Sequence, residues 1–176
     1  KSSREFFKWY AQPYRMNTQT ELVAFNAGLT LESGEKLDSF ELMVESYGEL
    51  NEARTNAILV CHAFSGNHHV SGENELKEIG WWNEIVGPNK AINTNKYYVV
   101  CCNNLGGCSG SSGPKSINPS TNKPYGSNFP LVTVSDWVNS QKMLMEKFNI
   151  PCWHLVVGGS LGGMQALQWS IAYPEK

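Results

Sequence analysis

The stretch Val156-Val157-Gly158-Gly159-Ser160-Leu161-Gly162-Gly163-Met164 decides the fold. It places a serine in a G-x-S-x-G pattern, after a short β-branched run and before an apolar stretch with helical character. Such a tight strand-to-helix turn needs small neighbours, because a Cβ at position 158 or 162 would crowd the backbone that presents the hydroxyl. We therefore predict that Ser160 is a nucleophile on an elbow between a strand and a helix.

Two other interpretations of these glycines are a phosphate-binding loop and a turn that only packs a helix onto a strand. Both common phosphate loops fail on spacing, because G-x-G-x-x-G needs glycine at position 160 or 161 and a Walker loop needs Gly-Lys-Ser/Thr. The purely structural turn stays open.

Enzymes with a serine elbow above an α/β sheet, the α/β-hydrolases, carry their triad in the order serine, acid, histidine. The four histidines of this chain, His62, His68, His69 and His154, all precede Ser160. The triad aspartate and histidine are therefore not in this chain. We expect it to be the N-terminal half of a larger enzyme, with the C-terminal half and the lid absent.

The hydrophobic pattern predicts an α/β fold with a mostly parallel central sheet flanked by helices. Continuous apolar runs at 57–61, 97–101 and 154–157 indicate parallel strands, and alternation at 21–25 and 40–47 indicates antiparallel edge strands. Helical spacing predicts a crossover helix from Ser135 to Phe148, and a second, buried helix follows Ser160 and ends before Pro174. Residues 21–176 form the catalytic half-domain, and residues 1–20 form an aromatic-rich extension.

Composition excludes several partners. The 176 residues are 41% hydrophobic and 17% charged, with a formal net charge of −2. That charge gives no reason to expect a nucleic acid or an anionic membrane as a partner, and no run approaches the roughly 20 apolar residues of a membrane span. A cytoplasmic protein is the default expectation. The five cysteines are interpreted as reduced core residues, and neither they nor the histidines have metal-ligand spacing, so no metal is expected.

A second chemical element is Cys61-His62-Ala63-Phe64-Ser65-Gly66, where a strand ends and a loop begins. Acyl transfer passes through an oxyanion that two backbone N–H groups can stabilise. We predict that the N–H groups of Leu161 and Phe64 form this oxyanion hole; an ordinary turn at Ser65-Gly66 is the alternative. Asn103, just past the strand, is a candidate substrate contact or a turn cap. The Gly-, Ser- and Asn-rich segment 103–128 is interpreted as a functional loop, with a floppy surface loop as the alternative.

The chain resembles the homoserine O-acetyltransferase family from about residue 21 to residue 176, which is only that family's N-terminal half. The segments that carry the resemblance are Gly80-Trp81-Trp82-Asn83-Glu84, Asn103-Asn104-Leu105-Gly106-Gly107-Cys108-Ser109-Gly110-Ser111-Ser112-Gly113-Pro114, Ser116-Ile117-Asn118-Pro119, Pro124-Tyr125-Gly126-Ser127, Phe129-Pro130 and the run from Gly158 to Leu167. This sequence has Phe64 and Leu161 where the family commonly has Leu and Met, changes that leave backbone donors intact. It has Asn104 where a small apolar residue is usual, and this change could alter the substrate pocket.

The resemblance implies acetyl transfer from acetyl-CoA to the side-chain hydroxyl of L-homoserine, through a seryl acyl-enzyme, in methionine biosynthesis. Acetyl-CoA is then a co-substrate, and no cofactor is bound permanently. A homodimer of the complete enzyme, or association with the missing C-terminal half, is expected. The alternatives are a homoserine or serine O-succinyltransferase or another O-acyltransferase, then a serine esterase, then a non-catalytic binding module with the same fold.

Overall fold

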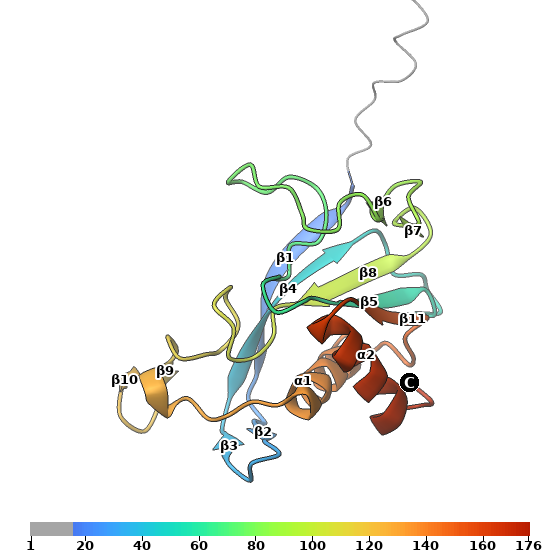
Figure 1. Ribbon diagram of the computed structural model, residues 1–176. Coiled ribbons are helices and arrows are strands. Elements are labelled where there is room, and N and C mark those ends of the chain that lie inside the picture. The colour runs from blue at the N-terminus through green and yellow to red at the C-terminus, as the bar shows by residue number, and fades with distance from the viewer. Residues whose placement is uncertain (1–15) are drawn as a thin grey trace, which may run out of the picture.

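A five-stranded sheet forms the centre of the protein in a computed structural model that describes residues 16–176 (Figure 1). The strands, in the order β1-β4-β8-β5-β11, are β1 (Thr18–Phe25), β4 (Phe40–Tyr47), β8 (Tyr98–Cys102), β5 (Ala57–Cys61) and β11 (Leu155–Gly158). β8, β5 and β11 run parallel, and β1 and β4 add antiparallel pairs. The α/β fold with a parallel core, predicted from the apolar runs, is confirmed.

Two details of the sheet differ from the sequence prediction. β4 is not an edge strand, because it lies between β1 and β8, and this position buries most of its residues. β1 begins at Thr18 instead of Glu21, so the last residues of the predicted extension 1–20 already belong to the sheet. The aromatic residues at positions 6–14 lie outside the described residues.

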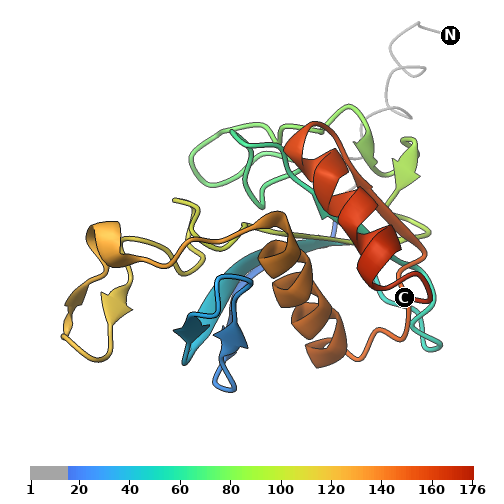
Figure 2. The ribbon, with the colours of Figure 1, turned by 60° about the horizontal axis from the view of Figure 1, so that its bottom comes forward.

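Short elements decorate the loops. β2 (Leu29–Thr30) pairs with β3 (Lys36–Leu37), β6 (Val86–Gly87) with β7 (Ile92–Asn93), and β9 (Ile117–Asn118) with β10 (Lys123–Pro124). A single turn of 3-10 helix, η2 (Gly126–Asn128), follows the last pair. The β9–β10 hairpin projects away from the sheet and the helices (Figures 1 and 2).

Helix α1 (Val134–Lys147) is the predicted crossover between β8 and β11. It begins at Val134, not at Ser135, because Thr133 caps it: the Thr133 hydroxyl accepts from the Asp136 N–H, and the Asp136 carboxylate accepts from the Thr133 N–H at 2.8 Å. This reciprocal capping box satisfies two backbone donors that would otherwise lack partners. The other carboxylate oxygen of Asp136 accepts from Glu32 N–H at 2.8 Å and so attaches α1 to the loop after β2.

The two faces of the sheet are covered differently. Helix α2 (Leu161–Ala172) lies beside α1, and both pack on one face (Figure 2). There, Leu59 and Cys61 of β5 share a buried cluster with residues of both helices. Ile58 and Val60 point to the opposite face, where they are covered by side chains of the long connection between β5 and β8. In the described residues, helices therefore flank only one face.

A buried chain of hydrogen bonds links the two helices beneath the sheet. Gln141 of α1 donates through Nε2 to Gln165 Oε1 of α2 at 2.6 Å, and Trp169 Nε1 donates to Gln141 Oε1 at 2.7 Å. Gln165 Nε2 then donates to the backbone oxygen of His62 at 3.4 Å. Because all these groups are enclosed, each needs its partner, and together they fix the rotation of α2 about its axis.

The sequence predicts a buried α2, and within the described residues only one side of this helix is buried. Only Gly162, Gln165 and Trp169 are buried. Met164, Leu167 and Ile171 are 60%, 63% and 67% exposed. An all-round apolar helix needs cover on two sides, and residues 16–176 cover only one.

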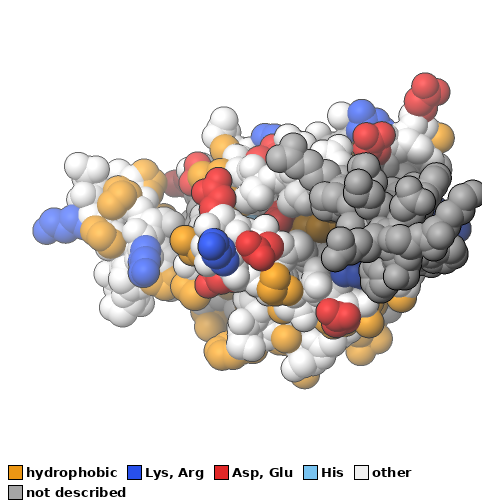
Figure 3. Space-filling model, turned by 90° about the horizontal axis from the view of Figure 1, so that it is seen from above, with side chains coloured by type: hydrophobic (Ala, Val, Ile, Leu, Met, Phe, Trp, Pro, Cys, Tyr) orange, Lys and Arg blue, Asp and Glu red, His pale blue; other side chains and the backbone are white. Residues whose placement is uncertain are grey.

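Charged side chains of both signs are scattered over the surface that Figure 3 presents, with no broad area of one sign among the described residues. Within residues 16–176 we find no helix that is long and apolar enough to span a membrane.

Candidate active site

Ser160 stands at the turn between β11 and α2 in a strained backbone conformation. Its φ of 55° and ψ of −124° are unfavourable for a residue with a side chain. A Cβ at Gly158 would come within 2.6 Å of the Cys61 carbonyl oxygen, and one at Gly162 would collide with the same carbonyl group. The close approach of the turn to the end of β5 therefore explains why both positions carry glycine.

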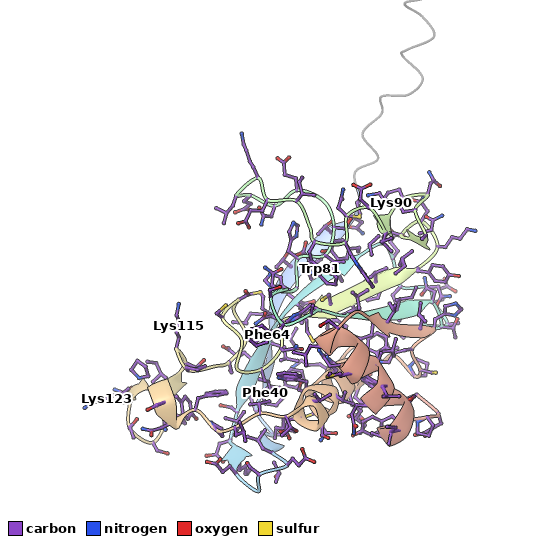
Figure 4. The ribbon with its side chains drawn as sticks, viewed as in Figure 1. Phe40, Phe64, Trp81, Lys90, Lys115 and Lys123 are labelled. Carbon is purple, nitrogen blue, oxygen red and sulfur yellow. The ribbon has the colours of Figure 1, made fainter. Side chains whose placement is uncertain are left out.

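The two proposed oxyanion donors lie beside one cavity. Leu161 is the first residue of α2, so its N–H has no acceptor within the helix. The Phe64 N–H makes no backbone hydrogen bond within residues 16–176, and the Phe64 ring is 89% exposed. Figure 4 shows Phe64 where the loops that leave the sheet meet. The roles of Ser160, Leu161 and Phe64 remain predictions that this geometry accommodates.

The cavity has a volume of about 630 Å³. Its walls come from the loop after β5, the loop after β8, the segment before α1 and the first residue of α2, and they include His62, Phe64, Asn103, Asn104 and Leu161. No Lys, Arg, Asp or Glu belongs to the described part of this wall. The cavity therefore offers neutral hydrogen-bonding groups and apolar side chains to a ligand.

His62 is a structural member of the site. The sequence predicts a solvated or substrate-facing loop histidine at this position, and the structure buries it. Its Nε2 accepts from the Asn104 N–H at 3.1 Å, and its Nδ1 lies 2.7 Å from the Ala63 carbonyl oxygen, to which it donates. Burial lowers the pKa of this imidazole, so the neutral form is favoured. With both ring nitrogens engaged, His62 joins the loops after β5 and β8 and is not free to act as the base for Ser160. Its place directly after a buried strand was the available signal.

An imidazole–carboxylate pair lines a different cavity. His69 Nδ1 is 3.1 Å from both carboxylate oxygens of Glu45, and burial raises the pKa of this carboxyl group. These residues line a different cavity, between β1 and the loop at 68–76. Neither His62 nor the His69–Glu45 pair therefore forms a triad with Ser160.

The segment 103–128 is held in place in its first half. The hydroxyls of Ser111 and Ser112 accept from Met43 N–H and Glu41 N–H, each at 2.9 Å, so this loop pairs with β4. Trp137 of α1 also donates to the Leu105 carbonyl at 2.9 Å. These bonds argue against a floppy surface loop and make the segment a fixed wall of the cavity.

Asn103 is buried in that wall. Its backbone N–H donates to Met43 at 2.8 Å, and its carbonyl accepts from the Ser111 hydroxyl. Its side-chain Nδ2 makes one long bond, 3.4 Å, to the Asn104 carbonyl. Asn103 thus has an anchoring role in the loop, and contact with substrate remains a prediction.

The cysteines divide into two groups. Cys61, Cys101 and Cys102 are buried, and burial raises the pKa of each thiol, to about 12 for Cys102. Cys108 and Cys152 are exposed, contrary to a core role for all five, because they lie in loops. All five are free thiols, and the part of the chain that the structure describes contains no group of three or more metal-ligating side chains.

Comparison with known proteins agrees with the fold. The family described as alpha/beta hydrolase fold matches residues 56–176. A homoserine O-succinyltransferase of Hahella chejuensis is 59% identical over 158 residues, which cover 89% of this chain and 41% of that protein.

Solved structures show the same likeness. The crystal structure of a homoserine O-acetyltransferase from Bacillus anthracis superposes with a TM-score of 0.84 at 38% identity and covers 89% of this chain and 44% of its own. That of esterase E22 superposes with a TM-score of 0.83, also at 38% identity, and covers 89% and 45%. The chain therefore spans less than half the length of these proteins.

Proposed function

Because this chain belongs to the alpha/beta hydrolase fold family, we propose that it forms part of a serine-dependent O-acyltransferase. The observation that carries this proposal is the strained backbone of Ser160 directly before α2, next to a cavity that Leu161 and Phe64 line. The backbone N–H groups of these two residues are the proposed oxyanion donors. Such donors stabilise the oxyanion that forms when a serine attacks an acyl group.

Homoserine is the proposed acceptor, and an acyl-CoA is the proposed donor. The support is the similarity to the Hahella chejuensis protein and to the Bacillus anthracis structure, whose names specify homoserine acyl transfer. The sequence resemblance alone implied acetyl-CoA. The curated relative at 59% identity is named a succinyltransferase, whereas the acetyltransferase structure is 38% identical, so succinyl-CoA is the better-supported donor.

The reaction proceeds in two transfers. The Ser160 hydroxyl attacks the thioester carbonyl carbon, gives its proton to a base, and forms an ester bond as the C–S bond breaks; CoA leaves as the thiol after taking that proton. The homoserine hydroxyl then attacks the seryl ester, loses its proton through the same base, and returns Ser160 to its free form. The base and its acid partner are proposed to come from outside residues 16–176, since both ring nitrogens of His62 are hydrogen-bonded and His69 lines a different cavity.

The test uses the complete enzyme, meaning this chain together with the segment that supplies the base. Rapid quench after mixing with succinyl-CoA, followed by intact-mass measurement, should show one covalent succinyl group, and Ser160→Ala should remove it. Addition of homoserine should discharge the adduct and yield O-succinylhomoserine. Absence of the adduct, or its persistence in Ser160→Ala, would refute the role of this serine.

An esterase is the second candidate, because esterase E22 is structurally as similar as the acetyltransferase. The two functions differ in how the acyl-enzyme is discharged. Release of free CoA that is strongly stimulated by homoserine supports the transferase. Release at the same rate without homoserine, with free acid as the product, supports the esterase.

A further inference from the structure

The side-chain amide of Asn104 lies in the cavity wall without a hydrogen bond to the described protein. Asn104 is 6% exposed, and its enclosed Oδ1 has no hydrogen-bond partner among the described residues. Its Nδ2 also makes no hydrogen bond to residues 16–176, so both amide N–H groups are free to donate. The hydrogen bonds of Asn104 within residues 16–176 use its backbone only. A largely buried amide whose N–H groups have no acceptor is costly to keep, so it calls for an explanation such as a bound ligand that carries an acceptor group.

The backbone of Asn104 is anchored on both sides of the peptide. Its N–H donates to His62 Nε2 at 3.1 Å, and its carbonyl accepts from Gly107 N–H at 3.0 Å and from Asn103 Nδ2 at 3.4 Å. The protein thus fixes where this residue stands and leaves its side-chain amide unused. Such an anchored but unpaired group is pre-organised for a ligand.

Asn104 lies close to the proposed oxyanion hole. His62, which binds its N–H, is two residues before Phe64, and Phe64, Leu161 and Asn104 line the same cavity. An acyl group whose carbonyl oxygen is held by Phe64 and Leu161 N–H therefore has its chain in this cavity. Among residues 16–176, the cavity wall contains no acidic side chain that would repel an anion, no Lys or Arg, and no imidazole other than the neutral His62.

We propose that Asn104 selects the acyl group by donating from Nδ2 to the terminal carboxylate of a succinyl chain. This inference rests on the proposed function and extends it to the choice of donor. An acetyl group ends in a methyl and offers the amide nothing, so the amide stays unpaired in the acetyl complex. A carboxylate accepts a charge-assisted hydrogen bond, which is stronger than a neutral one.

The test measures acylation of Ser160 alone, in the complete enzyme and without homoserine. Rates of acylation by succinyl-CoA and by acetyl-CoA are compared as a ratio of kcat/KM values from CoA release and intact mass. Asn104→Val removes the amide at similar volume, and Asn104→Asp keeps its shape but replaces the donor with an anionic oxygen. Asn95→Val, in the loop before β8, is the matched control.

Asn104→Val should lower the succinyl-to-acetyl ratio roughly 10- to 100-fold, the scale of one hydrogen bond to a charged group. Asn104→Asp should lower it further, because like charges repel, while acetyl transfer to Ser160 continues in both variants. An equal fall for both donors, or an unchanged ratio, overturns the inference, as does a wild-type enzyme acylated only by acetyl-CoA.

The design separates this inference from the proposed function. A wild-type enzyme that is acylated but does not pass the group to homoserine refutes the proposed acceptor, and the donor ratio still tests Asn104. A wild-type enzyme acylated by neither CoA ester refutes both. A fall in kcat/KM for homoserine with an unchanged donor ratio would assign Asn104 to the acceptor and overturn the choice of ligand.

Discussion

Replacing single glycines of the elbow with alanine should show whether each glycine is required because a side chain would clash or only because it is flexible. At Gly162 the added Cβ meets the carbonyl group of Cys61 and, at 3.2 Å, the carbonyl carbon of His62. All these atoms belong to the backbone, so no side chain can rotate away. At Gly159 the same Cβ meets nothing within 4 Å, and at Gly163 its nearest contact, Gly158 O, is at an ordinary 3.4 Å.

The expected magnitudes follow from these contacts. Gly162→Ala should destabilise the protein by about 3 kcal/mol, the upper end of overpacking costs, because the start of α2 must move away from β5. That movement displaces the Leu161 N–H, and a shift of about 1 Å at a catalytic group can cost roughly 100-fold in rate. Gly163→Ala lies inside α2 and should stabilise by up to about 1 kcal/mol, since alanine favours helix. Gly159→Ala should be close to neutral.

Urea unfolding of the complete enzyme and its three alanine variants measures the stability differences, and acylation by succinyl-CoA measures the rates. The reasoning fails if Gly162→Ala unfolds within about 0.5 kcal/mol of the wild type, the usual range for harmless surface changes. It also fails if Gly159→Ala and Gly162→Ala destabilise the protein equally, because the backbone clash at position 162 would then have no effect on stability.

Three further predictions concern the oxyanion donor, the buried imidazole and the exposed helix. Phe64→Leu should keep most acylation activity and Phe64→Pro should lose roughly 100- to 1,000-fold by removing the N–H; a folded proline variant with near-native turnover would show that this N–H is not used. Burial lowers the pKa of His62, so the stability contributed by its neutral ring is fully present above pH 6.5 and is lost as the pH falls towards the folded-state pKa. NMR titration of His62 should therefore give a midpoint below pH 6.5. A midpoint at or above pH 6.5 contradicts the burial argument. Residues 1–176 expressed alone should bind a hydrophobic dye through the exposed Leu167 and Ile171, and Leu167→Glu should weaken this binding; a fragment that binds no dye would mean that this face is covered.

The sequence was sufficient for features that depend on neighbours along the chain. The elbow around Ser160, the apolar strands at 57–61 and 154–157, and the crossover helix all follow from local pattern, and the structure contains each of them. The early start of α1 was missed because its capping box uses Asp136, a shorter acid than the usual Glu.

Features that depend on distant pairing were not predictable. β4 lies between β1 and β8, a position that only the sheet order reveals. The hydrogen bond between His62 and Asn104 joins two loops that are 42 positions apart in the sequence, so no local pattern predicts it. Likewise, the sequence of α2 is apolar on both sides of the helix, but it does not show which side packs against residues 16–176 and which side stays exposed in them.

The hydrogen-bonded chain of Gln141, Gln165 and Trp169 has a consequence for how this protein can change. Loss of one glutamine leaves the buried polar atoms of the other without a hydrogen-bond partner. The two positions are therefore expected to vary together among relatives, and rarely singly. Every partner in this hydrogen-bond network, including the His62 carbonyl, lies within the described residues. If all of these residues were transferred together into a relative, the hydrogen bonds that fix α2 against α1 and the loop after β5 would be transferred with them. A recombination point between Gln141 and Gln165 would separate the two glutamines and lose these hydrogen bonds.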